Sequence, residues 1–130
     1  MAVKPIPDGY NNVSPYLLVQ GVPKLLEFLA SAFGAKEIMR TTGGAGGIHA
    51  EARIGDSVVM MGDVGSRAPT PAAMYLYVEN VDETYKRAMR AGAKSQEEPS
   101  DKPFGDRTAT IIDPCGNTWF VATHIRDVVH

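Results

Sequence analysis

The sequence predicts an α+β fold of two tandem βαβββ modules, because its second half repeats the plan of its first half. Three matches carry this repeat, and all have an offset of 58 or 59 residues. In chain order, they join 16–22 to 75–81, 34–36 to 92–94, and Ile54 to Ile112. Since self-similarity at a fixed spacing indicates a duplicated unit, we expect modules over about 11–64 and 72–127 within a single domain at 1–130.

The first module follows from its hydrophobic pattern. Residues 13–19 are rich in β-forming side chains, and 22–33 carry apolar residues spaced to make one helical stripe. Gly34 suits the left-handed conformation that often ends a helix. Residues 48–54 alternate apolar with polar side chains, which is typical of a half-buried strand. The remaining expected segments are a strand over 35–42, a glycine-rich hairpin connection at 43–47, a turn at 55–56 and a strand over 57–62.

The second module is predicted to repeat this order. We expect strands over 73–78, 93–98, 107–112 and 118–124, and a helix over 81–91 that stops at Gly92. The tight turn 113–116 precedes the last strand, and 69–71 links the two modules. The stretch from Pro99 to Asp106 is expected to be a loop.

Composition excludes several classes of partner. The net charge is −2, and the 13 Lys and Arg residues are scattered, so neither nucleic acid nor an anionic membrane surface is expected to bind. No apolar run approaches the roughly 20 residues of a membrane span. The N-terminus lacks the apolar region of a signal peptide, and the single cysteine, Cys115, fits a reducing compartment. We therefore expect a cytoplasmic protein.

Five segments resemble a known superfamily: 49–51 (HAE), 54–57 (IGDS), 105–107 (GDR), 113–119 (DPCGNTW) and 119–124 (WFVATH). Together with the paired βαβββ plan, they are similar to the vicinal-oxygen-chelate superfamily of glyoxalases, bleomycin-resistance proteins and extradiol dioxygenases, and most to its PhnB-like branch. The resemblance implies that the strands form a cup-shaped, barrel-like eight-stranded sheet with the helices on its convex face. The ligand is then expected in the concave face, which the segment 99–106 would cover as a lid. Since this superfamily hosts unrelated activities, the resemblance leaves the reaction open.

The resemblance also implies where a metal would bind. In the catalytic members, four cup-facing positions supply His, Gln or Glu to a divalent ion. Carried over to this chain, the positions fall on Ser14, Met60 (or its neighbour Met61), Ala73 and Phe120. Alanine and phenylalanine have no donor atom, and hydroxyl and thioether groups are poor ligands for such ions. We therefore expect no metal at the usual site and no cofactor.

Strand alternation then assigns the lining of the cup. On the third strand of the first module, His49 and Glu51 are expected to face it, and the repeat puts Arg107 in the equivalent place. His49, Glu51 and His124 are candidate catalytic residues, although polar residues on the open face of a strand are more commonly hydrogen-bonded or solvent-facing. Trp119 is expected to point away and pack under a helix. The predicted ligand-binding residues are Tyr16, His49, Glu51, Met60, Tyr75, Tyr77, Arg107, Phe120 and His124.

Three functions remain open at this stage. The first is a protein that sequesters or carries an aromatic or hydrophobic small organic ligand. The second is a lyase, isomerase or dioxygenase that uses either a rearranged metal site around His49, Glu51 and His124 or metal-free acid/base catalysis. The third is a structural or regulatory module whose cup is filled by its own side chains, such as Phe120. The resemblance further implies a homodimer, with or without exchange of modules.

Overall fold

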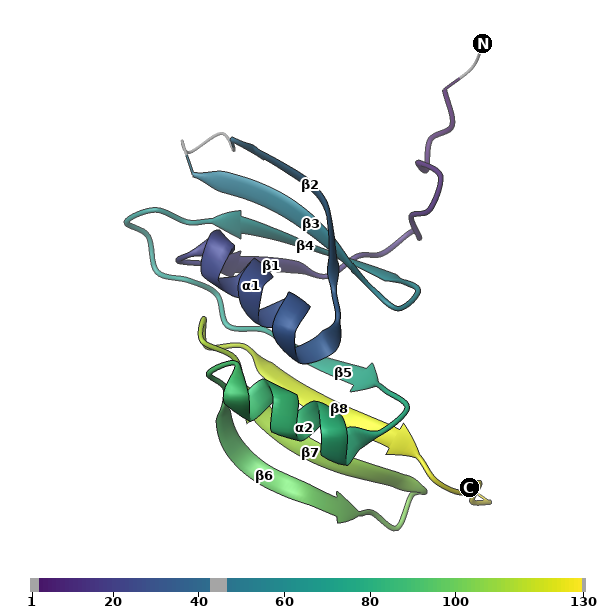
Figure 1. Cartoon of the computed structure of the whole chain (residues 1–130). Coiled ribbons are helices and arrows are strands. Elements are labelled where there is room, and N and C mark those ends of the chain that lie inside the picture. Colours follow the sequence, from purple (N-terminus) through teal and green to yellow (C-terminus); the bar gives the residue numbers. More distant parts are fainter. Residues whose placement is uncertain (1–2, 43–46, 130) are drawn as a thin grey trace.

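The computed structural model describes residues 3–42 and 47–129 (Figure 1). Most of the predicted glycine-rich hairpin connection, residues 43–46, lies outside the described residues. The elements follow in the order β1 (Tyr16–Val19), α1 (Val22–Phe33), β2 (Lys36–Thr42), β3 (Ile48–Ile54), β4 (Ser57–Asp63), β5 (Ala73–Tyr77), α2 (Val81–Arg90), β6 (Lys94–Asp101), β7 (Asp106–Ile112) and β8 (Thr118–His124). Neither described helix has the length and apolar character needed to cross a membrane.

Each half of the chain forms its own four-stranded sheet, with the orders β1-β4-β3-β2 and β5-β8-β7-β6. In both sheets the first strand of the half pairs in parallel with the last, and the other pairs are antiparallel. The predicted α+β class and tandem βαβββ modules are confirmed. The eight strands do not, however, join into one continuous sheet within the described chain, because no ladder pairs a strand of one half with a strand of the other.

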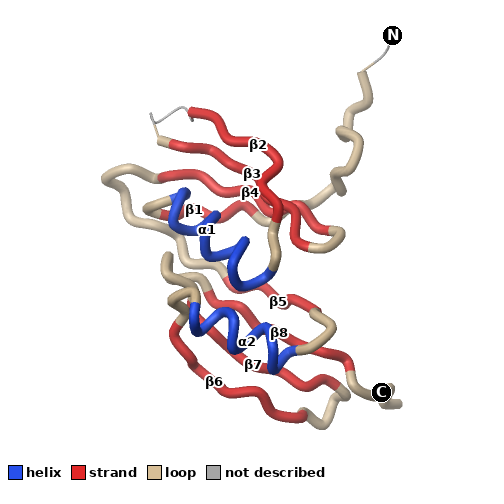
Figure 2. The backbone as a smooth tube through the Cα atoms, viewed as in Figure 1, coloured by secondary structure: helices blue, strands red, loops and turns tan. Residues whose placement is uncertain are grey.

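The helices cover one face of each sheet and also contact each other (Figures 1 and 2). Helix α1 buries Leu25 and Leu29 against the first sheet, while Val81 and Ala88 of α2 are buried over the second. The Phe33 ring at the end of α1 lies 4.9 Å from the ring of Trp119, which is buried as the sequence predicts. One hydrophobic core therefore joins the two halves.

Two aspartates fix the chain around these elements. Asp63, at the end of β4, accepts hydrogen bonds from the backbone N–H groups of Gly21 and Val22, both at 2.9 Å, and so caps the start of α1. Asp113 accepts bonds from the backbone N–H of Cys115 and from the Trp119 indole. The 113–119 motif is therefore a structural turn that aligns β8.

Most boundaries lie within one residue of the prediction, and two differ by three residues. Strand β1 begins at Tyr16 rather than at residue 13, and β6 continues to Asp101. The loop predicted at 99–106 is therefore shorter than expected, because only residues 102–105 separate β6 from β7. Strand β6 is polar and contains Pro99, which an edge strand tolerates since its outer N–H groups need no partner. Its sequence consequently carries little strand signal.

Candidate functional site

The face of each sheet that no helix covers is called here its open face. Several large apolar side chains lie exposed on these faces, including Tyr16, Tyr75, Tyr77 and Phe120. They alternate along the strands with core residues such as Leu17, which is almost fully buried on the helix side. Since a monomeric protein seldom exposes contiguous apolar surface, such faces are typical of binding sites.

On the second sheet, the open face is organised around the carboxylate of Asp106. Asp106 is the first residue of β7, and only 3% of its surface is exposed. Tyr75 and Tyr77 donate hydroxyl hydrogen bonds to its Oδ2 at 2.6 and 2.9 Å, and Nδ1 of His124 lies 2.8 Å from its Oδ1. Phe120 stacks beside Tyr75 at 6.2 Å between ring centroids. A buried acid thus holds two tyrosines and a histidine in fixed positions.

The charges of this cluster follow from its hydrogen bonds. Bonds from Tyr75 and His124 lower the pKa of Asp106. Burial and the neighbouring Asp106 raise the pKa of Tyr75. The pKa of His124 is raised by Asp106 and by Asp127, whose Oδ1 lies 2.7 Å from Nε2. The acid is therefore ionised, the tyrosines are neutral, and the imidazole favours its protonated form.

On the first sheet, a second cluster surrounds Glu51, which is 8% exposed in the middle of β3. Tyr10, from the segment before β1, donates to Glu51 Oε1. Nε2 of His49 lies 3.3 Å from Glu51 Oε2, and the hydroxyl of Tyr16 lies 2.8 Å from Nδ1 of the same imidazole. The bond to Glu51 raises the pKa of Tyr10. Here, too, a buried acid anchors two tyrosines, one of them through a histidine.

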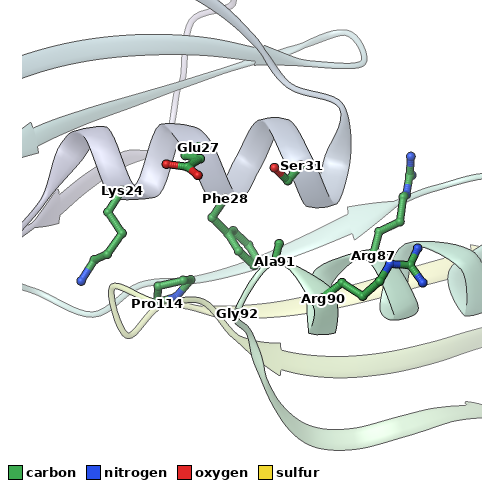
Figure 3. Close-up of a pocket in the computed structure, with 9 residues that line it drawn as sticks. All are labelled: Lys24, Glu27, Phe28, Ser31, Arg87, Arg90, Ala91, Gly92 and Pro114. Carbon is green, nitrogen blue, oxygen red and sulfur yellow. The ribbon is translucent and has the colours of Figure 1, made fainter.

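Small hollows adjoin both clusters. One of about 510 Å³ is lined by Tyr10, Glu51 and Met60, and one of about 420 Å³ by Thr110 and Phe120. A hollow of about 720 Å³ is lined in part by Tyr75 and Tyr77, and another of the same size lies between α1 and α2 (Figure 3). Its lining is Lys24, Glu27, Phe28, Ser31, Arg87, Arg90, Ala91, Gly92 and Pro114, which includes none of the predicted site residues.

The comparisons with known proteins agree with this geometry. The model of the glyoxalase/bleomycin resistance protein/dioxygenase superfamily matches residues 10–121, which span both halves. The chain belongs to this superfamily. An uncharacterised protein of Mycobacterium bovis is 33% identical over 129 residues, covering 89% of this chain and 85% of that protein. A counterpart from Mycobacterium tuberculosis has the same identity and is covered to 76%.

Solved structures share the fold. TioX from Micromonospora sp. ML1 is 24% identical with a TM-score of 0.69, over 88% of this chain and 100% of that one. A glyoxalase I variant from Zea mays is 17% identical with a TM-score of 0.73, over 84% of this chain and 45% of that one. At these identities, the likeness concerns the fold alone.

The positions at which the resemblance places metal ligands do not suit a divalent ion in this chain. Met60 and Phe120 lie on the open faces, each paired across its ladder with a tyrosine, Tyr16 or Tyr75. Neither Phe120 nor Ala73 has a donor atom, and a thioether is a poor ligand for hard divalent ions. Over the ranges that the structure describes, no three His, Cys, Asp or Glu side chains gather into another metal site.

Most predicted lining residues share the open faces, but they form separate groups. The ladders place His49 opposite Gly62 and Glu51 opposite Met60 on the first sheet, whereas His124 pairs with Asp106 on the second. The predicted grouping of His49 and Glu51 with His124 is thus absent among the contacts of the described chain.

The placement of Arg107 on the open face is wrong. Its guanidinium bonds to Asp82 of α2 at 3.0 and 3.1 Å and to Asp101 at 2.9 Å, so it lies on the helix side. Its neighbour Thr108 shares a row with Tyr77 of the open face instead.

The error comes from the offset of the repeat. The ladders join Tyr16, Met60 and Glu51 in one row, and Tyr75, Phe120 and Thr110 in the equivalent row. Glu51 therefore corresponds to Thr110, an offset of 59, whereas the match of Ile54 with Ile112 has an offset of 58. A slip of one residue moves every side chain of a strand to the other face.

Asp106 was not among the predicted site residues. It lies in the 105–107 motif, but the sequence placed it at the end of the loop expected at 99–106, and at an offset of 59 its counterpart is Gly47. Tyr10 was also missed, because it lies outside the repeat and reaches Glu51 only through the path of the N-terminal segment.

Proposed function

We propose that this protein binds a small aromatic or hydrophobic organic molecule on its open faces and sequesters or carries it. The observation that carries the proposal is the exposure of Tyr16, Tyr75, Tyr77 and Phe120 around two buried carboxylates. Aromatic rings stack on an aromatic ligand, and a few fixed polar groups orient it, as in most organic-ligand sites. We assign the protein to the PhnB-like branch on its sequence motifs and to the cytoplasm on its single cysteine.

We further propose that the functional unit is a homodimer. In one chain the aromatic side chains of both open faces are exposed to a degree that is costly in water. A second copy in two-fold symmetry supplies a surface to cover them. The hollows beside Glu51 and beside Phe120 would then become enclosed sites rather than shallow depressions.

The binding function is tested by titrating the protein with naphthol and with methoxynaphthalene, followed by amide chemical shifts in NMR. Saturable shifts along β1, β5 and β8 are expected. Phe120→Ala should weaken binding at least about fivefold, since a buried aromatic contact contributes roughly 1 kcal/mol. Phe104→Ala is the matched control, because Phe104 is similarly exposed but lies in the loop between β6 and β7. Absence of saturable binding would refute the proposal.

One observation favours a second candidate, a metal-free acid/base isomerase or lyase. His124 lies between Asp106 and Asp127, and both contacts raise its pKa toward the range where an imidazole exchanges protons at neutral pH. The test is solvent deuterium incorporation into an aryl ketone, next to its carbonyl, in the presence of the protein. Incorporation lost in His124→Gln would support catalysis, and incorporation equal to the protein-free rate would exclude this candidate for such substrates.

A further inference from the structure

The two tyrosines of the second open face use their hydroxyl protons in hydrogen bonds within the protein. Asp106 is an ionised carboxylate and can only accept hydrogen bonds, so Tyr75 and Tyr77 must both donate to it. Each phenolic oxygen is then left with lone pairs alone. Tyr77 is 60% and Tyr75 47% exposed, so a ligand on this face contacts both side chains beside their part-buried bonds to Asp106.

On the first open face, the hydrogen bonds of the tyrosines run in the same direction, from the tyrosine hydroxyl to a protein acceptor. Tyr10 donates to Glu51, and the imidazole of His49 turns Nε2 toward the same side chain. When Nε2 carries the proton, Nδ1 accepts one from the hydroxyl of Tyr16. The hydroxyl protons of Tyr10, Tyr75 and Tyr77 are therefore used within the protein, and so is that of Tyr16 in this tautomer of His49, which leaves the four phenolic oxygens as acceptors.

Other donors on these faces lie away from the tyrosine oxygens or are shielded. Arg53, on the same side of β3 as His49 and Glu51, directs its guanidinium to the carbonyl of Gly9, and Thr118 on the second open face is half-buried. Thr108 and Thr110, which share the second open face, are both buried. A carboxylate acts on each bound phenol as a negative charge, which makes the phenolic oxygen a stronger acceptor. A ligand that offers only acceptors would have to draw a tyrosine proton away from Asp106 or Glu51, and it would then leave a nearly buried acid without a partner.

From this arrangement, and given the proposed binding function, we infer that the protein selects aromatic ligands whose polar groups are hydrogen-bond donors. The substrate class is a phenol or an aromatic amine, and an aromatic carboxylate is disfavoured. The choice is made by the direction of four tyrosine protons, which the two buried acids set.

The experiment compares three probes of one shape at neutral pH: naphthol, methoxynaphthalene and naphthoate, each substituted at the same ring position. Dissociation constants are measured by NMR titration of the full chain. Naphthol should bind roughly five- to tenfold more tightly than methoxynaphthalene, the effect of one hydrogen bond of about 1 kcal/mol. Naphthoate should bind most weakly.

Tyr77→Phe provides the decisive variant, since Asp106 keeps Tyr75 and His124 as partners and the sheet keeps its rings. It should bring the affinity for naphthol close to that for methoxynaphthalene and leave the latter unchanged. Tyr85→Phe is the matched control, because it removes a hydroxyl that bonds Ser95 instead of either acid.

Each outcome has a defined meaning. Equal affinity for naphthol and methoxynaphthalene, or tightest binding of naphthoate, would overturn the inference while leaving the proposed binding function intact. A preference for naphthol that survives in Tyr77→Phe but is lost in Tyr75→Phe would keep the inference and assign it to the second ring. A preference that survives in both variants on the second sheet and in Tyr16→Phe would overturn it. If no naphthalene binds, both proposals fail.

Discussion

The two open faces reach the same chemistry by different routes. On the first sheet, Glu51 sits in the middle of β3, and one of its partners, Tyr10, comes from the segment before β1. On the second, Asp106 sits at the start of β7, and the side chains that bond it come from β5 and β8. The first cluster therefore depends on how an external segment is placed, whereas the second is built into the sheet.

The two halves therefore share their order of strands and helices but not the positions of their cluster residues. Glu51 and Asp106 occupy non-equivalent positions of the repeat, because the residue equivalent to Glu51 is Thr110. The backbone beneath the clusters differs as well. Gly62 pairs with His49 on the first sheet, and Ala122 takes the equivalent place beside Thr108 on the second.

The largest expected effect comes from deleting the two acids in turn. Asp106→Ala removes the acceptor of three side chains and should lower the free energy of unfolding by about 2–3 kcal/mol, as expected for hydrogen bonds to a charged group. Glu51→Ala should cost about 1 kcal/mol, since Tyr10 can return to water with its segment. Urea unfolding measures both values. Equal losses in the free energy of unfolding for the two variants would contradict the view that only the Asp106 cluster is built into its sheet.

A smaller effect is expected at Gly62. A Cβ added there would lie 2.9 Å from the hydroxyl of Tyr16, so Gly62→Ala should displace this ring and break its bond to His49. The net stability should change by no more than about 1 kcal/mol, because one hydrogen bond is lost while the unfolded chain loses freedom. The readout is the NMR shift of the His49 ring.

Ala122→Gly is the matched control on the second sheet. It should leave the rings of Tyr16 and His49 unchanged and keep the bond from Tyr77 to Asp106. A Gly62→Ala protein whose His49 ring resonances stay in place would show that the first cluster does not need the glycine.

The smallest effect is a pH dependence confined to the second cluster. The pKa of His124 is raised above its ordinary 6.5 by Asp106 and Asp127. A raised folded-state pKa stabilises the fold fully below the unfolded-state value, and this contribution is lost as the pH rises through the folded-state value. Thermal unfolding should therefore show a falling melting temperature from pH 6.5 upward. His124→Gln should remove this slope, and a slope that persists in the variant would assign it to another group.

Much of the fold could be predicted because its signals are local. The stripe of α1, the alternation of β3 and the glycine after each helix lie within short windows of sequence, and the repeat then orders the elements. The extension of β6 could not be predicted in the same way, since its exposed polar residues acquire strand geometry only by pairing with β7.

The candidate site was only partly predictable for a related reason. Strand alternation is enough to place His49, Glu51 and Tyr75 on open faces once the register is known. Arg107 was misplaced because a side chain's face depends on a register that one residue can reverse. Register is set by the partner strand and by the length of the connecting turn, and neither is visible in one strand alone.

The sequence by itself determined the α+β class, the two βαβββ modules and the unsuitability of Met60, Ala73 and Phe120 as metal ligands, since these follow from periodicity and from the atoms of each side chain. Only the tertiary structure decided that Asp106 and Glu51 become buried acids with tyrosine partners. Burial and hydrogen bonding join residues that are 18 to 41 positions apart. Such proximity is a property of the folded chain, because packing brings together groups that no local pattern connects.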